Sequence, residues 1–316
     1  MPRMRVISQR SLGGPDVLEV VDVERPAPGP GQVLVGVRAA GVNPSDRKVR
    51  SGYVRLFGDP PFTLGHEFSG VVTEVGASVD GFRVGDEVFG WVNPPHGAYA
   101  DYVVVPSTSL AAKPTSLDHV HVAALTIAGL TALKALEKVD QVRPGRRVLV
   151  HGAAGGVGHL AVQIAKARGA HVIGAARAAK HDFLRRLGVD ELVDYEAEDF
   201  ARTRDVDVVL DTIGGEVGLR SLATLNPGGA VVDVVGLGLD RTVVRERAEA
   251  SAVRFVEFNL TPEPGDLDAL VRLADRDGVA PVVEEVLPLT EAGRAHSLCE
   301  SGQVRGKVVL ATSSAD

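Results

Sequence analysis

The feature that most constrains the fold is an apolar stretch that runs through a glycine-rich turn into a helical pattern. Residues 148–153 read as a buried strand, the turn AAGGVG occupies residues 153–158, and apolar residues recur at helical spacing over residues 157–168. Strand-like runs, among them residues 171–176 and 206–211, then alternate with helical runs as far as a sixth strand at residues 254–259. This alternation predicts βαβ units and a parallel sheet.

The glycines of the turn predict a dinucleotide site. Gly155 lets the backbone approach a pyrophosphate, Gly158 lets the helix pack closely on the strand, and the helix N-terminus offers free N–H groups. Alanine stands at position 153, where the usual fingerprint has its first glycine. An ordinary turn could carry the same glycines, but the strand–turn–helix context favours the dinucleotide. We expect the pyrophosphate to contact Ala154, Gly155, Gly156 and Val157.

The end of the second strand of this unit indicates which nicotinamide cofactor binds. NAD enzymes usually place Asp or Glu there to bind the ribose 2′-hydroxyl. This chain has GAAR at residues 174–177 and then a lysine, so no carboxylate is present. Arg177 and Lys180 stand where a 2′-phosphate would lie, although both are also compatible with a solvated surface. The sequence therefore predicts NADPH.

The rest of the chain has a different character. Roughly the first 110 residues read as valine-rich strands bounded by Gly, Pro or Asp, and the tail after residue 280 is mixed. A chain of 316 residues accommodates two domains. We expect a β-rich domain built from residues 1–118 and 281–316, with the nucleotide-binding domain of residues 119–280 inserted into it.

Composition excludes several classes of protein. The net charge of −7 arises from 41 acidic and 34 basic residues without long runs of one sign, which argues against nucleic acid or anionic membranes as partners. No apolar run approaches the roughly 18–20 residues of a membrane span, and the N-terminus lacks the apolar stretch of a signal peptide. A single cysteine, Cys299, permits no internal disulfide. We expect a cytoplasmic protein that binds a small-molecule substrate.

Six motifs carry a resemblance to a known family: AAGVNPSDRKVRSGY at 39–53, LGHEFSGVVTEVG at 64–76, VGDEVFG at 84–90, AGLTA at 128–132, HGAAGGVGHLAVQIAKARGAHVIG at 151–174 and GQVRGKVVL at 302–310. With them the chain resembles the medium-chain dehydrogenase/reductase superfamily, in particular its zinc-free quinone oxidoreductase branch. The resemblance implies an α/β fold, in which a Rossmann doubly wound parallel sheet is inserted into a β-rich GroES-like catalytic domain.

The resemblance also implies that no metal takes part. Zinc-dependent alcohol dehydrogenases have a catalytic cysteine where this chain has Asn43, and their third ligand region corresponds to residues 124–129, which offer no ligand. Only His66 and Glu67 of the GHE motif remain, and a catalytic zinc needs about three protein ligands. Substrates that accept hydride unaided, namely quinones and α,β-unsaturated carbonyl compounds, are therefore favoured.

Site residues follow from the same resemblance. Asn43 is expected near the nicotinamide ribose or the substrate, and Tyr53 either donates a proton or has a packing or gating role. The remaining cofactor contacts are expected from Thr131 near the nicotinamide, Tyr195 near the adenosine, Gly236 and Leu237 along the cofactor path, and Arg305 and Lys307 near the diphosphate or substrate.

Two other functions stay open beside an NADPH-dependent quinone or enone reductase. One is an enoyl-thioester reductase of the polyketide type, which performs the same chemistry on a carrier-bound substrate. The other is a non-catalytic NADPH-binding module. A homodimer is expected in each case, because the strand at residues 254–259 would be an apolar edge strand.

Overall fold

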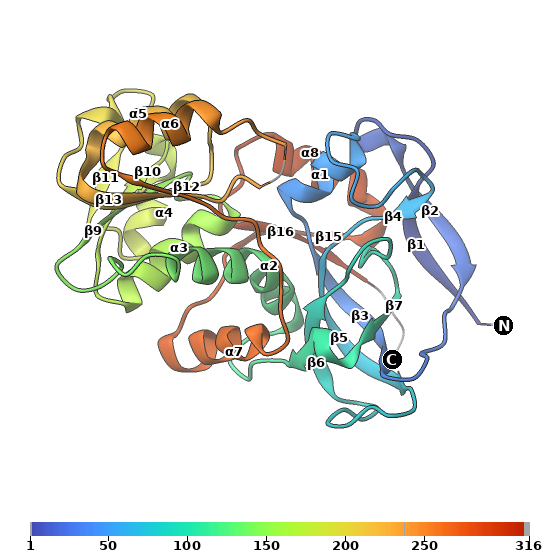
Figure 1. Cartoon of the computed structure of the whole chain (residues 1–316). Coiled ribbons are helices and arrows are strands. Elements are labelled where there is room, and N and C mark those ends of the chain that lie inside the picture. Colours follow the sequence, from blue (N-terminus) through green and yellow to red (C-terminus); the bar gives the residue numbers. More distant parts are fainter. Residues whose placement is uncertain (1, 237, 313–316) are drawn as a thin grey trace. The chain divides into compact units, whose positions relative to one another are not determined.

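The structure is a computed structural model that describes residues 2–236 and 238–312, and it divides the chain into two compact units (Figure 1). Unit 1 contains the described residues up to 127 and from 262 on, and unit 2 contains residues 128–261. The division falls inside helix α2 (His119–Leu136), later than the boundary expected at residue 118.

Helix α7 (Asp266–Asp277) belongs to unit 1, although the sequence suggested that the nucleotide-binding unit continues to residue 280. Two hydrogen bonds connect this helix to the rest of unit 1. The Asp275 carboxylate on α7 accepts from the backbone N–H groups of Thr115 and Ser116, at 3.4 and 3.0 Å. In this division the second boundary comes before α7, and the expected boundary at residue 280 stays a prediction.

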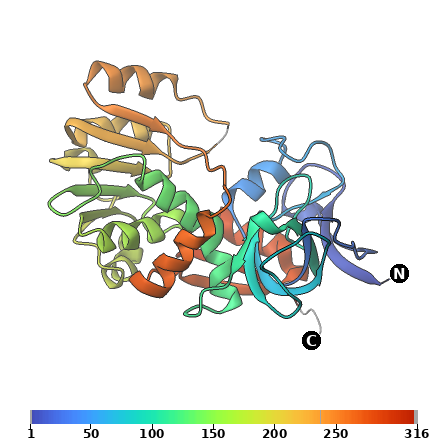
Figure 2. The same ribbon diagram turned by 60° about the horizontal axis from the view of Figure 1, so that its bottom comes forward.

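Unit 2 is built on a six-stranded sheet in which every pairing is parallel. The strand order is β11-β10-β9-β12-β13-β14, which is the order of a doubly wound nucleotide-binding sheet. Helix α3 (Gly156–Ala167) covers one face, and α5 (Glu216–Ser221) and α6 (Thr242–Ala250) cover the other (Figures 1 and 2). The strands are β9 (Arg147–His151), β10 (His171–Ala175), β11 (Glu191–Val193), β12 (Val206–Asp211), β13 (Leu225–Asp233) and β14 (Arg254–Glu257).

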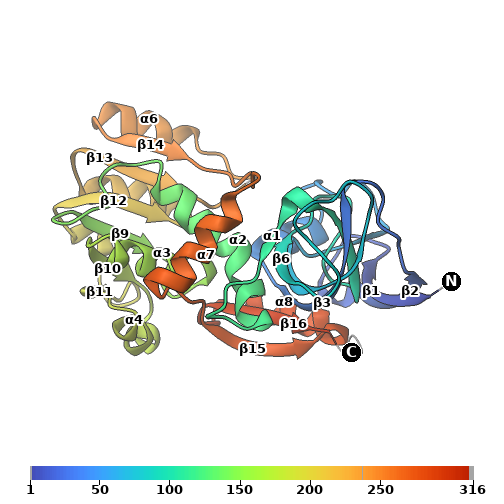
Figure 3. The ribbon, with the colours of Figure 1, turned by 90° about the horizontal axis from the view of Figure 1, so that it is seen from below.

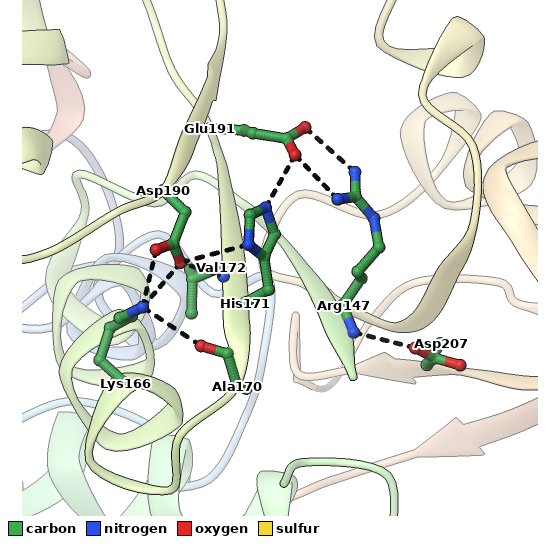
Figure 4. A network of polar contacts seen from close by, with 8 residues as sticks. All are labelled: Arg147, Lys166, Ala170, His171, Val172, Asp190, Glu191 and Asp207. Atoms are coloured by element: carbon green, nitrogen blue, oxygen red, sulfur yellow. Dashed lines mark hydrogen bonds and ion pairs between the residues drawn. The ribbon is translucent and has the colours of Figure 1, made fainter. Parts of the chain in front are cut away.

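The amino ends of these strands are tied by an ion-pair network (Figure 4). Arg147, at the start of β9, donates both Nη groups to Glu191, at 2.8 and 3.0 Å, and His171 contacts the same carboxylate. Lys166 on α3 donates to the carboxylate of Asp190, the residue that precedes Glu191. Exposed pairs of this kind stabilise a fold only modestly. These pairs occupy the amino edge of the sheet. Doubly wound sheets bind their ligands at the opposite edge, where the carboxyl ends of the strands lie.

Unit 1 is β-rich and uses both ends of the chain (Figure 3). A seven-stranded sheet has the order β15-β16-β3-β5-β6-β8, with β7 also paired to β3, and a separate sheet has the order β2-β1-β4. Strand β16 (Lys307–Ala311) pairs with β3 (Gln32–Gly41) so that Val309 faces Gly41. The other strands are β1 (Arg3–Gln9), β2 (Leu18–Glu24), β4 (Phe62–Thr63), β5 (Glu67–Val75), β6 (Glu87–Trp91), β7 (Tyr102–Pro106), β8 (Leu110–Ala112) and β15 (Val283–Pro288).

Helix α2 departs from the expectation that no segment approaches a membrane span. By length and composition it could cross a membrane, because its 18 residues are strongly apolar. Its side chains are mostly buried, however, and Ala123, Ala124 and Leu125 are fully so. A core helix of a soluble protein passes the same test, so α2 is weak evidence for a span.

Candidate active site

The glycine turn lies at the carboxyl edge of the unit 2 sheet. It follows β9, and Gly155 caps the N-terminus of α3 without a side chain that could occupy the free N–H groups. A Cβ at position 158 would lie 2.2 Å from the carbonyl oxygen of Gly152, so only glycine allows the helix to approach the strand this closely. Ala154 is buried and Val157 half-buried. The turn therefore has the open cradle that a pyrophosphate requires.

The end of β10 carries the expected cations together with an acidic neighbour. Arg177 Nε lies 2.8 Å from Glu196 Oε1, and both side chains are exposed. Lys180 is half-buried one turn further on, and Tyr195, beside Glu196, is exposed. Strands β10 and β11 are parallel neighbours, so residues that follow them meet at the same edge. Glu196 was not predicted from the sequence, although it belongs to an acidic run that follows β11.

Two buried carboxylates end the next strands of the sheet. Asp211 ends β12, and its Oδ1 accepts the N–H groups of Ile213 and Gly214, at 2.8 and 2.9 Å. Burial raises the pKa of this carboxyl group. Asp233 ends β13 and binds Arg241, whose guanidinium also donates to the carbonyl of Gly236 at 2.6 Å.

These contacts shape the loops that follow β12 and β13. Gly236, an expected cofactor contact, has φ +80°, a conformation that favours glycine. Leu237, the other residue expected there, lies outside the described residues. Asp211, Asp233 and Arg241 were not predicted from the sequence, although the two aspartates stand at the ends of apolar runs.

Unit 1 contains a buried polar cluster of Asn43, Glu67 and Lys307. The Asn43 amide donates from Nδ2 to Glu67 Oε1 at 2.7 Å and accepts at Oδ1 from Lys307 Nζ at 2.6 Å. Lys307 Nζ also lies 2.8 Å from Glu67 Oε1. The three residues are 6%, 0% and 3% exposed, so this ion pair is shielded from water. The structure thus brings two of the expected site residues, Asn43 and Lys307, into direct contact.

The local sequence explains the position of Asn43. It precedes α1 (Pro44–Arg50), and the Asp46 carboxylate accepts its backbone N–H at 2.8 Å. Asp46 also accepts from the Tyr99 hydroxyl at 2.9 Å, and burial together with this neighbouring charge raises the pKa of Tyr99. A Cβ at position 41 would lie 2.2 Å from Glu67 Oε1, so Gly41 leaves the space that the carboxylate fills.

Asn43 lines a small pocket of about 160 Å³ within unit 1. Arg47 on α1 and Cys299 on α8 (Ala292–Glu300) are among the other lining residues. Burial raises the pKa of the Cys299 thiol to about 11, which keeps it protonated at neutral pH. A protonated thiol is a poor nucleophile, so Cys299 forms part of the pocket wall and does not act as a nucleophile.

The remaining expected residues are not among the hydrogen-bond partners of this cluster. Tyr53 is 56% exposed in the turn after α1, and Thr131 is buried on α2, in unit 2. Arg305 donates from Nε and Nη2 to both oxygens of Glu284, at 2.7 and 2.8 Å, at the surface of unit 1. The guanidinium of Arg305 is thus already paired within its own unit.

The two residues that remain of the GHE motif differ in their contacts. Glu67 pairs with Lys307, whereas His66 Nε2 lies 3.6 Å from Asp46 Oδ1 and has no hydrogen-bond partner among the described residues. Within the described ranges, no three His, Cys, Asp or Glu side chains group so that they could hold a metal ion. The chemistry of this cluster is that of an ammonium, an amide and a carboxylate.

Comparisons with known proteins agree with this architecture. Residues 29–115 match the alcohol dehydrogenase GroES-like domain family, and residues 187–310 match a family described as zinc-binding dehydrogenase. The chain is 35% identical to a 2-haloacrylate reductase of Burkholderia sp. over 94% of this chain and 96% of that protein. It is 32% identical to the mitochondrial NAD(P)H oxidoreductase RTN4IP1 of Homo sapiens over 89% of this chain and 82% of that protein. The solved quinone oxidoreductase from Coxiella burnetii superposes with a TM-score of 0.92 at 37% identity and covers 98% of this chain and 99% of that chain.

A parallel doubly wound sheet with a glycine turn, joined to a GroES-like unit, defines the class of nicotinamide-dependent oxidoreductases. The chain belongs to the medium-chain dehydrogenase/reductase superfamily, in its quinone-oxidoreductase-like branch. The comparisons support an NAD(P)H oxidoreductase. The fold and family expected from the sequence are confirmed.

Proposed function

We propose that the protein is an NADPH-dependent reductase that transfers hydride to a quinone or an α,β-unsaturated carbonyl compound without a metal ion. One observation carries the proposal: Lys307 Nζ lies 2.6 Å from Asn43 and 2.8 Å from Glu67, at two positions where zinc-dependent relatives have metal-binding motifs. A cation held there by the protein itself competes with a bound zinc ion. The names of a 2-haloacrylate reductase and a quinone oxidoreductase among its relatives support both substrate classes.

The residues of unit 2 fit a dinucleotide. The turn of Gly155 and Gly156 would hold the pyrophosphate at the N-terminus of α3, and Arg177 and Lys180 would hold a 2′-phosphate. Thr131, Tyr195 and Gly236 remain expected contacts. When bound, the cofactor supplies the hydride, and the protein contributes binding and orientation.

Without a metal, the substrate itself must be able to accept hydride. Quinones and enones do so because the added charge is delocalised onto an oxygen atom. The amide of Asn43 would donate a hydrogen bond to an oxygen of the ligand, and its 6% exposure keeps that bond away from competing water. Tyr53, exposed in its turn, would supply a proton to an enolate, whereas water can protonate a hydroquinone.

The test is to follow NADPH loss with a panel of 9,10-phenanthrenequinone, alkenals and enoyl thioesters, with and without a chelator, alongside zinc analysis of the protein. We expect turnover that the chelator leaves unchanged and a zinc content far below one per chain. Asn43→Ala should lower turnover at least about tenfold, and Asn93→Ala, at an exposed position of the same unit, should not. Tight NADPH binding without any turnover would instead indicate a binding module. About one zinc per chain would overturn the metal-free proposal.

A further inference from the structure

We propose that Lys307 and Glu67 are positioning residues that lock the Asn43 side-chain amide in one orientation. In this orientation one N–H group of the amide is available to donate a hydrogen bond to a carbonyl or hydroxyl oxygen of the ligand. This inference rests on the proposed function only in that Asn43 contacts a ligand. Lys307 and Glu67 themselves act through Asn43.

The chemistry of the two partners leaves only one amide orientation. An ammonium only donates hydrogen bonds and a carboxylate only accepts them. Asn43 Oδ1 must therefore face Lys307 Nζ, at 2.6 Å, and Nδ2 must face Glu67 Oε1, at 2.7 Å. A flipped amide would place N–H against the ammonium and oxygen against the carboxylate, so both hydrogen bonds would be lost.

Both partners are themselves fixed. Lys307 uses its three N–H groups on Asn43, on Glu67 and on the carbonyl of Val42 at 2.9 Å. The second oxygen of Glu67 accepts the backbone N–H of Ile127. With exposures of 3% and 0%, neither charge can turn towards water. The amide of Asn43 is consequently held by two charged groups that further buried contacts fix in place.

The other hydrogen of Asn43 Nδ2 is the one left for a ligand. A side-chain amide carries two N–H groups, and Glu67 accepts one of them. No acceptor for the other is found in the part of the chain that the structure describes, and Asn43 lines the pocket of about 160 Å³. The charge on Lys307 next to Oδ1 polarises the amide, which strengthens donation from Nδ2.

A double-mutant cycle tests whether Lys307 acts through Asn43. We expect Lys307→Met to lower kcat/KM for quinone or enone at least about tenfold in the natural chain and less than about twofold when Asn43→Ala is already present. Lys113→Met is the matched control, because Lys113 is largely buried and lies 3.4 Å from Glu87 in the same unit. It should leave kcat/KM unchanged. An equal loss from Lys307→Met in both backgrounds would show a general effect on the fold and overturn the proposal.

A second pair of variants covers the case that Lys307→Met does not fold, since it leaves the Glu67 carboxylate buried and unpaired. Lys307→Met combined with Glu67→Gln removes both charges and leaves an amide at position 67 that can either donate or accept. We expect this double variant to fold, to lose at least about tenfold in kcat/KM, and to lose little more when Asn43→Ala is added. A further full tenfold loss on adding Asn43→Ala would mean that Asn43 works without the ion pair, against the proposal.

Nuclear magnetic resonance of the ¹⁵N-labelled protein gives a readout that does not depend on activity. The side-chain amide signals of Asn43 are identified by their loss in Asn43→Ala. We expect slow hydrogen exchange for the proton bonded to Glu67, and exchange at least about tenfold faster in Lys307→Met with Glu67→Gln. Unchanged exchange would refute the lock. Should the natural protein reduce no quinone or enone, the proposed function fails, while this measurement still decides the orientation of Asn43.

Discussion

At the scale of a single residue, the expected preference for NADPH depends on Arg177. Its guanidinium is paired with the carboxylate of Glu196, which would compete with the 2′-phosphate of the cofactor. We expect NADPH to bind at least about tenfold more tightly than NADH, a difference of about 1.4 kcal/mol, because no carboxylate directly follows β10. Arg177→Ala should abolish the preference. Glu196→Gln should increase it, because the guanidinium is then free for the 2′-phosphate.

Fluorescence titration of both cofactors measures these dissociation constants. Arg185→Ala is the control, since Arg185 is likewise exposed and paired with a neighbouring acid, Asp182, in unit 2. Equal affinity of the natural protein for NADPH and NADH would contradict the prediction, as would an unchanged preference in Arg177→Ala.

Tyr53 separates the two substrate classes. Its side chain is 56% exposed, so the phenol is accessible to a ligand. If enones are the natural class, Tyr53→Phe should lower their turnover roughly 10- to 1000-fold, the range of lost proton-transfer or oxyanion assistance. Quinone turnover should barely change, because water can protonate the reduced product.

The measurement compares turnover of both classes and the NADPH dissociation constant, which should stay constant. Tyr102→Phe, on β7, is the control for removing a phenol from unit 1. A large loss on quinones with none on enones would overturn the role of Tyr53 as a donor. Small, equal effects on both substrate classes would mean that Tyr53 has no role in proton transfer.

The candidate site was predictable from the sequence only where local chemistry decides it. The turn at Gly155 and the cations at Arg177 and Lys180 follow from residue type and position after a strand. The partnership of Asn43 with Lys307 does not, because it depends on the antiparallel register of β16 with β3, two strands from opposite ends of the chain. Glu196 was missed for the same reason, since its contact with Arg177 requires β11 to lie beside β10.

At the scale of elements, the strands buried on both faces were the easiest to predict. Residues 148–153, 171–176 and 206–211 were expected as strands, and β9, β10 and β12 occupy nearly the same ranges. Continuous runs of valine and leucine are typical of strands that a parallel sheet buries on both faces. Helix α7 was missed, although its buried leucines at 267, 270 and 273 have helical spacing.

Helices α1 and α8 are joined by a contact that should make stability depend on pH. Arg50 Nη1 on α1 lies 2.8 Å from His296 Nδ1 on α8, so this nitrogen must accept and the ring must be neutral. Burial lowers the pKa of His296 to about 4; the nearby Asp46 opposes this, and the charge of Arg50 adds to it. A histidine whose pKa is lower in the folded state stabilises the protein above its unfolded pKa of about 6.5.

We therefore expect the contribution of His296 to be lost as the pH falls from about 6.5 to 4, by about 3 kcal/mol. Urea unfolding at several pH values measures this, with the fluorescence of Trp91, the chain's only tryptophan, as the reporter of unit 1. His296→Asn keeps an acceptor for Arg50 but does not titrate, so its free energy of unfolding should change less over this range. Parallel curves for the two proteins would refute the prediction.

For the whole molecule, we propose a homodimer that forms through β14. It pairs with β13 on one side, and no strand of the described chain pairs with its other side. Its residues Phe255 and Val256 are half-buried and apolar, and an apolar sheet edge tends to be paired or covered. A second copy related by a two-fold axis can pair its own β14 there, because such an interface uses the same surface twice.

Light scattering at micromolar concentration should therefore give twice the chain mass of 33.1 kDa. Val256→Lys should shift the protein towards the monomer, because a lysine on each copy places like charges side by side at the edge. Val243→Lys is the matched control, since Val243 is an exposed valine on α6 of the same unit. If the natural protein has the mass of a monomer, the edge is not paired, and if both lysine variants remain dimeric, the interface lies elsewhere. Loss of the dimer in Val256→Lys alone would locate the interface at β14, because the added charge is the same in both variants and only its place on the molecule differs.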